Sequence, residues 1–353
     1  MSYFLKIKLL AYRFFTSPFG KSILKNMSFA VTAPFLRKNT QKKKYPFHVV
    51  ITIDTESGYV DKNQRRVWQG ENPRNYQGYY FGIYNLRNVF RKYKIAATFF
   101  LSTNCFSAVA PEYKKIRHEL NALQKDGHEL GLHFHPDSDL VLQKRLNKKF
   151  PATSAFYYSH EEKKEVLSAA KELIKEHLGK SVHENLKSFR WGNWALDGPG
   201  AKALHELGFQ IDSSATPGIQ GHLGDPREYH WEKARQQEPW YIDFKDHQNT
   251  QRTKKGLLEI PIATFTFFGT PMRADPLNSI LLKHAFDYYY RNADRSQKPF
   301  IFVIITHSAE ATTRDGSPTR TLADLEEFII HSKKKADVKF MTIKQAAAEL
   351  KKQ

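Results

Sequence analysis

The sequence predicts an α/β fold built from parallel strand–helix units, and three observations lead to this prediction. The chain has 353 residues, of which 41% are hydrophobic and 14% aromatic, so it can form a large core. From residue 46 onward, short apolar runs rich in Val, Ile and Phe alternate with segments of helical periodicity. Seven or eight such units favour an irregular (β/α)7–8 barrel over an open sheet, because a single barrel often reaches about 250 residues.

Most of the expected strands are near-continuous in apolar residues, which is typical of strands that are covered on both faces. They span residues 47–53, 95–101, 130–134, 186–190, 208–211, 257–265, 300–306 and 338–342. The helical segments between them span 82–93, 111–125, 160–178, 199–207, 277–292, 321–335 and 343–352. Residues 57–80 and 218–256 interrupt the alternation. Long loops of this kind in a compact domain predict lids or binding loops.

Residues 1–45 form a basic segment in front of the expected barrel domain, which takes up residues 46–353. The first 53 residues contain no Asp or Glu but ten Lys and Arg, about half of the net charge of +19. Aromatic and aliphatic side chains lie between these cations, which suits an amphipathic element on an anionic membrane surface. A tail that packs on the domain or stays disordered, a nucleic-acid arm and a transit peptide are the alternatives.

The same segment bears on localisation. No apolar run reaches the roughly 18 residues of a spanning helix, and Lys8 and Arg13 interrupt the pattern of a signal peptide. The lone Cys105 excludes an intramolecular disulfide and fits a reducing compartment. We therefore expect a cytoplasmic protein, peripheral on the inner face of the membrane. No nucleic-acid partner is expected, because no recognition motif is present.

The residues able to carry chemistry lie where the expected strands end. Asp54 and Glu56 follow the first strand, and His133 and His135 end the third. Further strands end at three more ionisable residues, which are Arg190, Asp212 and His307. In a parallel barrel these positions share one rim, where the active site is built. Imidazole nitrogens and carboxylate oxygens are zinc ligands, so the pattern predicts a divalent metal site and a metal-dependent hydrolase.

Seven segments also resemble, in order, the motifs of polysaccharide deacetylases, the NodB-homology domain of carbohydrate esterase family 4. They are residues 52–56, 97–100, 126–133, 189–194, 208–214, 258–261 and 305–308. The resemblance spans about residues 46–345 and implies a barrel of the NodB-homology type. It also implies an enzyme that removes an N-acetyl group from an amino sugar, with zinc or a similar ion as cofactor and a carbohydrate as substrate.

Carried over by position, the resemblance implies a role for each residue. Asp54 would be the general base, and Arg190 would hold it ionised and oriented. His307 would protonate the departing amine, with Asp212 stabilising its imidazolium. The metal ligands would be Glu56, His133 and His135.

The chain departs from the family pattern at three places. Thr55 stands where the family has a second aspartate, so Glu56 is expected to take that ligand role. The two histidines are separated by one residue rather than lying four apart, and Asp137 is an alternative third ligand. Trp-Gly-Asn-Trp follows the arginine in place of a Pro-containing sequence, and Trp191 and Trp194 are candidates for stacking on a sugar.

Three functions therefore compete at the sequence level. The favoured one is a metal-dependent N-deacetylase acting on a glycan or on a cell-envelope glycan precursor. A related amidohydrolase acting on a small C–N substrate is the second. The third is a catalytically degenerate barrel that binds glycan, and the retained base, acid, arginine and histidines argue against it. Metal content together with acetate release discriminates among the three.

Overall fold

The computed structural model describes residues 31–36, 43–68, 70–72, 74–250 and 255–351. A nine-stranded sheet forms its centre, with the strand order β10-β11-β7-β6-β5-β4-β1-β14, and β15 pairs with β1 as well. All neighbours in this sheet are parallel except β10 and β11. The strands of this sheet are β1 (Phe47–Thr55), β4 (Thr98–Ser102), β5 (Glu129–Phe134), β6 (Ser188–Trp191), β7 (Ile211–Asp212), β10 (Trp240–Tyr241), β11 (Leu258–Glu259), β14 (Phe300–His307) and β15 (Val338–Phe340).

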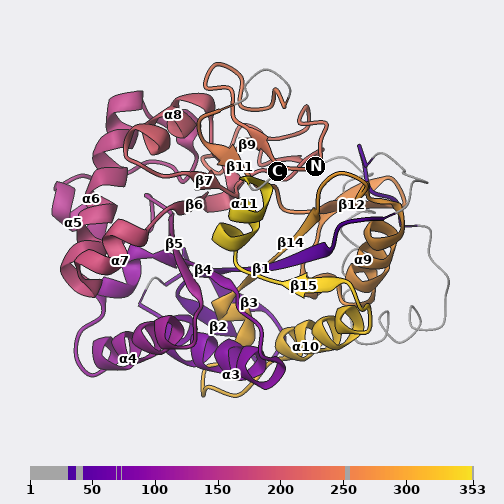
Figure 1. Ribbon diagram of the computed structural model, residues 1–353. Helices are drawn as coiled ribbons and strands as arrows, with labels where there is room; N and C mark the ends of the chain where they lie inside the picture. Colours follow the sequence, from indigo (N-terminus) through magenta and orange to yellow (C-terminus); the bar gives the residue numbers. More distant parts are fainter. Residues whose placement is uncertain (1–30, 37–42, 69, 73, 251–254, 352–353) are drawn as a thin grey trace, which may run out of the picture.

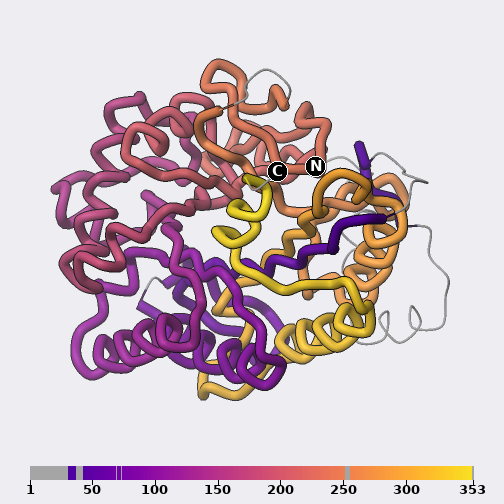
Figure 2. The backbone as a smooth tube through the Cα atoms, viewed as in Figure 1, coloured from indigo at the N-terminus to yellow at the C-terminus, as the bar shows by residue number. Residues whose placement is uncertain are grey.

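Helices lie around the outside of the curved sheet, as Figure 1 shows. They are α3 (Ile83–Tyr93), α4 (Glu112–Lys125), α5 (Leu140–Leu146), α6 (His160–Leu178), α7 (Lys180–Asn185), α8 (Gly198–Glu206), α9 (Ile280–Asn292) and α10 (Arg320–Lys333), whereas α11 (Ile343–Lys351) lies in the middle of this view. The expected irregular barrel of parallel strand–helix units is confirmed. The last strand of the chain, β15, returns to the first, β1, and the two lie side by side in the backbone trace (Figure 2).

The alternation of side chains along β1 and β14 separates two apolar layers. Val49 and Ile51 of β1 belong to the large core that the outer helices cover. Val50, between them, belongs to a second core with Val303 and Ile305 of β14, and α11 packs into that core. Because successive residues of a strand point to opposite faces, Asp54 continues the Val50 face of β1. The strand pattern alone thus turns Asp54 toward the barrel interior.

Three antiparallel hairpins form outside the main sheet, within or beside the segments that interrupt the strand–helix alternation. They are β2 (Gly58–Val60) with β3 (Arg66–Trp68), β8 (Gln220–Gly221) with β9 (Tyr229–His230), and β12 (Thr264–Phe267) with β13 (Thr270–Arg273). The expected strand 257–265 is wrong in one respect, because it is two strands, β11 and β12, separated by residues 260–263. Helices α5 and α7 were not expected, because each is too short to show a clear helical periodicity in the sequence.

Part of the basic N-terminal segment packs on the barrel. Val31 is buried against Phe265 and Phe267 of β12, and Thr32 exchanges backbone hydrogen bonds with Thr266 of the same strand. Residues 1–30 and 37–42 lie outside the described residues, and so does most of the predicted membrane-contact element. Within the described ranges, none of the helices combines the length and the apolarity needed to cross a bilayer.

Candidate active site

Three side chains converge at the ends of β1 and β5 in a geometry suited to a metal ion. Oε1 of Glu56 lies 3.0 Å from Nε2 of His133 and 2.9 Å from Nε2 of His135, and the two nitrogens are 3.1 Å apart. The His-x-His spacing works because residues two apart on a strand point the same way. Among the described residues, these three form the group of His and carboxylate side chains that could hold an ion.

Both imidazoles are oriented by their other ring nitrogen. Nδ1 of His133 lies 2.9 Å from the backbone oxygen of Arg190, which can only accept, so Nδ1 carries the proton and Nε2 is left as a donor atom for an ion. Nδ1 of His135 lies 3.4 Å from Oγ1 of Thr153, and that hydroxyl donates to Asp137. Asp137 therefore contacts His135 only through Thr153, and it is not part of the group of converging ligand atoms.

The electrostatics of this group fit a divalent cation. Glu56 is buried, and burial alone would raise the pKa of its carboxyl, yet His135, His133 and Arg66 together hold that pKa well below its usual range. The ionised carboxylate and two imidazole nitrogens form a mixed N and O set, and zinc takes such ligands at about 2.0–2.2 Å. Three ligand atoms about 3 Å apart are compatible with tetrahedral bonds of that length.

Asp54, the expected general base, is held by Arg190. Nη1 of Arg190 lies 2.8 Å from Oδ1 of Asp54, and both side chains are buried. The guanidinium is itself fixed by Ser213, whose backbone oxygen accepts from Nε at 2.7 Å and whose hydroxyl accepts from Nη2 at 3.0 Å. It also lies over the ring of Phe100. A buried guanidinium with this many fixed contacts holds its carboxylate neighbour in one orientation.

His307 lies beside Asp54, because the two residues are paired in register on β14 and β1. Its Nε2 is 3.9 Å from Oδ2 of Asp54, and its Nδ1 is 3.2 Å from Oε1 of Glu310. The second oxygen of Glu310 accepts from the backbone N–H of His307. The imidazole of His307 and the guanidinium of Arg66 hold the pKa of Glu310 below its usual value, against the opposing effect of burial.

The expected partnership of Asp212 with His307 is wrong, because Asp212 faces other groups. Its two oxygens accept from the backbone N–H and the hydroxyl of Ser214, and its neighbour across the sheet is Glu259. Burial and the charge of Asp212 raise the pKa of Glu259 well above its usual range. Glu259 therefore keeps its proton and shares it with Asp212, in a buried carboxyl pair near Arg190.

One cavity of about 620 Å³ collects the reactive groups. Asp54, Glu56, His135 and His307 line it, whereas His133 and Arg190 lie fully buried behind them. The remaining lining residues are Trp68, Gly70, Glu71, Asp137, Ser138, Thr153, Asn193, Trp194, His222, Arg227 and Arg273. A volume of this size is within the range of about 300–1,000 Å³ that is typical of small-molecule sites.

The two candidate tryptophans have different environments. Trp194 lines the cavity, as expected of a residue that contacts substrate. The prediction that Trp191 does so is wrong, because its side chain is 1% exposed, packs on Phe134 and Phe189, and donates its indole N–H to the backbone of Thr153. Trp191 follows the outward alternation of β6 and belongs to the core.

Two glycines allow the start of α3 to pack closely against the loops that follow β1 and β14. A short π-helical turn, Gly78–Gly82, leads into α3. A Cβ atom on Gly78 would lie 2.1 Å from the backbone oxygen of Glu56, and one on Gly82 would lie 2.1 Å from that of Ser308. Both contacts are far below van der Waals distance, so only glycine fits. The close packing fixes the backbones that follow β1 and β14.

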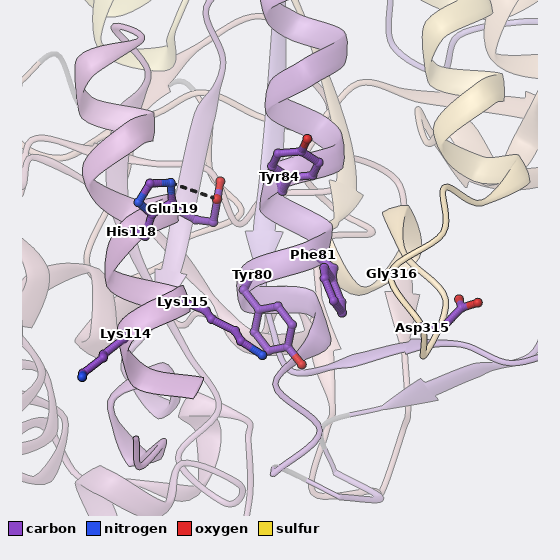
Figure 3. A pocket seen from close by; sticks show the side chains of 9 residues that line it. All are labelled: Tyr80, Phe81, Tyr84, Lys114, Lys115, His118, Glu119, Asp315 and Gly316. Atoms are coloured by element: carbon purple, nitrogen blue, oxygen red, sulfur yellow. Dashed lines mark ion pairs between the residues drawn. The ribbon is translucent and has the colours of Figure 1, made fainter. Parts of the chain in front are cut away.

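Figure 3 shows a second cavity, of about 510 Å³, between α3 and α4. Tyr80, Phe81 and Tyr84 form its aromatic side, and Lys114, Lys115, His118, Glu119, Asp315 and Gly316 complete it. Its acid Glu119 pairs with Arg87 at 3.3 Å, and none of the predicted catalytic or metal-binding residues lines it. Among the described residues this cavity therefore lacks the grouped ligands and the base that the first one holds.

Three residues that contact the candidate site residues were not predicted from the sequence. Arg66 begins the short strand β3, within a segment whose sequence shows no strand pattern; Glu310 lies in the turn after β14, and Thr153 lies in a loop. A signal was available for Glu310, because a carboxylate three residues after a terminal histidine faces it across one turn. No comparable signal identified Arg66 or Thr153, since their contacts join distant parts of the chain.

Fold and site together define an irregular α/β barrel with a candidate metal centre on its carboxyl-terminal rim. Residues 78–211 match the model of the family described as "Polysaccharide deacetylase". This match supports the resemblance to polysaccharide deacetylases that the sequence motifs predicted. A search of the curated proteins finds no significant match.

Three solved structures illustrate the shared fold. A protein of Mycobacterium smegmatis described as a polysaccharide deacetylase has 17% identity and a TM-score of 0.55, covering 92% of this chain and 96% of its own. Puue allantoinase has 16% identity and a TM-score of 0.55, with 86% and 89% covered. A glycoside hydrolase/deacetylase of Parabacteroides distasonis has 14% identity and a TM-score of 0.58, with 88% and 72% covered. At these identities the likeness is one of fold.

Proposed function

We propose that this protein is a metal-dependent N-deacetylase that removes the acetyl group from an amino sugar of a glycan or glycan precursor. The observation that carries the proposal is the convergence of Asp54, His307 and the group formed by Glu56, His133 and His135 on one cavity. Water and an acetamide would give acetate and a free amine. Such a reaction needs a base for the water and an acid for the amine.

Glu56, His133 and His135 would hold the ion, for which zinc is the expected choice. When bound, a divalent ion polarises an amide carbonyl and makes water more acidic. Asp54 would accept the proton of the attacking water, with Arg190 keeping it ionised. Nε2 of His307 would deliver a proton to the departing amine, and Glu310 rather than Asp212 would stabilise the imidazolium.

Metal analysis of the purified protein and an assay of acetate release from N-acetylglucosamine and its oligomers test the proposal. We expect about one equivalent of divalent metal, loss of turnover after chelation, and recovery with zinc. A metal-loaded protein that releases no acetate from any N-acetylated sugar would refute the deacetylase.

A small C–N substrate is the second candidate, because one of the proteins that share this fold is named an allantoinase. Hydrolysis of allantoin or of simple amides without acetate release from sugars would favour that candidate. A protein with neither metal nor turnover would favour a glycan-binding barrel.

We also propose that the N-terminal segment contacts an anionic membrane and keeps the enzyme at the cytoplasmic side. The proposal is supported by the absence of acids and the ten cations among the first 53 residues. Some of residues 31–36 pack on the barrel, so the test variant should lack only residues 1–30. The full chain is expected to sediment with vesicles containing phosphatidylserine, and the shortened chain to stay in solution. Equal binding of both would refute the proposal.

A further inference from the structure

The catalytic cavity carries a stacked arginine that the proposed chemistry does not use. Arg273 ends β13 and lines the cavity together with Trp194. Its guanidinium carbon lies 3.6 Å from the centre of the Trp194 ring, and its Nη1 donates to the hydroxyl of Tyr229 at 3.1 Å. A guanidinium stacked on an indole keeps its plane fixed while its edge stays available for hydrogen bonds.

The charge of Arg273 is not neutralised by an ion pair within the part of the chain that the structure describes. A guanidinium has five N–H donors, and both partners of Arg273 given above are uncharged. Asp275 follows two residues later, but its carboxylate accepts from the backbone N–H of Leu277. Burial and the charge of Glu310 raise the pKa of Asp275 to about 7, against the opposing charges of His307 and Arg273, so Asp275 offsets Arg273 only in part.

Two other basic residues line the same cavity, but one is ion-paired and the other is neutral. Arg227 is occupied by Asp225, with Nε–Oδ1 and Nη2–Oδ2 distances of 2.9 and 2.8 Å. Burial, followed by the charge of Arg227, lowers the pKa of His222, so this histidine is neutral at neutral pH. Arg273 therefore supplies positive charge to this part of the cavity that no direct ion pair among the described residues neutralises.

The support beneath Arg273 is built at a conformational cost. Asn193 and Trp194 both adopt left-handed backbone conformations, with φ of 50° and 58°. Such conformations of residues other than glycine are uncommon and concentrate at functional sites. The indole N–H of Trp231 donates to the backbone oxygen of Trp194 at 2.8 Å and helps to hold it in place. Trp194 is thereby kept at the cavity wall with Arg273 on its ring.

We propose that Arg273, stacked on Trp194, binds an oxyanion of the substrate, so that the substrate is an N-acetylated amino sugar carrying a phosphate or a carboxylate. This inference rests on the proposed deacetylase function. Arginine recognises both kinds of anion through paired N–H donors. Asp54 and Asp137 line the same cavity and repel an anion. The charged group is thus directed to Arg273, and the acetamide to the catalytic residues.

The test compares acetate release from N-acetylglucosamine, N-acetylglucosamine 1-phosphate and N-acetylmuramic acid by the wild type, Arg273→Met, Arg273→Lys and the exposed control Arg320→Met. The wild type should prefer the phosphate or the carboxylate sugar, and that preference identifies the anion. Arg273→Met should reduce the preference by about 10- to 100-fold, mainly through KM, since charge-assisted hydrogen bonds have that strength. Arg273→Lys should retain part of it, and Arg320→Met all of it.

Calorimetric binding of N-acetylglucosamine 1-phosphate separates this inference from the deacetylase proposal. If no sugar releases acetate, the proposed function fails, but weaker binding by folded Arg273→Met than by the wild type would still support the anion site. A wild type that prefers the neutral sugar would overturn the inference. Equal losses on all three sugars in Arg273→Met, or unchanged binding, would do the same.

Discussion

Arg66 bridges Glu56, a proposed metal ligand, and Glu310, the partner of the proposed catalytic His307. Its Nη2 lies 2.7 Å from Oε2 of Glu56, and its Nη1 lies 2.9 Å from Oε1 of Glu310. The ring of Trp68 covers the guanidinium at 3.6 Å. Arg66, in the β2–β3 hairpin, therefore orients two residues that lie 254 positions apart in the chain. Glu56 and Glu310 lie on loops that follow different strands.

Replacing Arg66 should weaken metal binding. In Arg66→Met, Glu56 loses its fixed orientation, and we expect metal affinity to fall by about 10- to 100-fold, as for other residues that orient ligands. Titration of the metal-free protein with zinc measures the affinity. Arg65→Met is the matched control, because that neighbouring side chain is 61% exposed and pairs, among the described residues, with Asp61 and Glu71, neither of which is a proposed metal ligand. Tighter binding in Arg66→Met would mean that charge repulsion outweighs orientation.

The roles of base and ligand can be separated by two substitutions. Asp54→Asn should keep the metal but lower kcat by about 10²- to 10⁴-fold, because the amide cannot accept the proton of water. His133→Ala should lose the metal, since it removes one of three converging donor atoms. Metal analysis beside single-turnover acetate release measures both. An empty metal site in Asp54→Asn would show that the two roles are assigned the wrong way round.

Gly82→Ala tests the close approach of α3 to the loop after β14. The new Cβ would lie 2.1 Å from the backbone oxygen of Ser308. We expect a loss of stability of about 1–3 kcal/mol and a lower kcat, because the His307 loop must shift. Asn88→Ala, at an exposed position of the same helix, is the control and should change neither. Thermal unfolding and kcat together are the measurements.

The two tryptophans should respond differently to substitution by alanine. Trp191→Ala opens a cavity in the core and should cost about 3–5 kcal/mol of stability, measured by denaturant unfolding. Trp194→Ala removes part of the cavity wall and should raise KM by about 5- to 30-fold with a smaller loss of stability. Unchanged KM in Trp194→Ala would exclude a substrate contact.

His128 should make the protein sensitive to mild acid. Burial lowers the pKa of its imidazole to about 4, and its Nδ1 accepts from the backbone N–H of Ala97. Between pH 6.5 and 4 the unfolded chain binds more protons than the folded one, so stability is complete above pH 6.5 and decreases as the pH falls. The contribution is about 3 kcal/mol.

In His128→Asn the amide oxygen can still accept from Ala97 but does not titrate. We expect a lower free energy of unfolding at pH 7, because ring contacts with Phe90 and Phe99 are lost, and a shallower decline between pH 6.5 and 4. Denaturant unfolding at several pH values measures both. His48, whose pKa is also lowered to about 4 by burial, should leave part of the decline in place. A decline as steep as that of the wild type would refute the assignment to His128.

The sequence by itself determined the order of strands and helices and the set of residues at the strand ends. Apolar runs such as residues 47–53 and 300–306 specify buried parallel strands, and the alternation along a strand gives His133 and His135 the same direction. Because these rules are local, the sequence alone predicts a set of ionisable residues on one rim of the barrel. They are Asp54, Glu56, His133, His135, Arg190 and His307.

The tertiary structure decided which of these residues meet and what supports them. Asp212 faces Glu259 rather than His307, Trp191 lies in the core, and Arg66, Thr153 and Glu310 complete the site. The 254 positions between Glu56 and Glu310 carry no pattern that predicts their common contact with Arg66. Periodicity determines the face on which a side chain lies, whereas its partner depends on how loops from separate strands pack together.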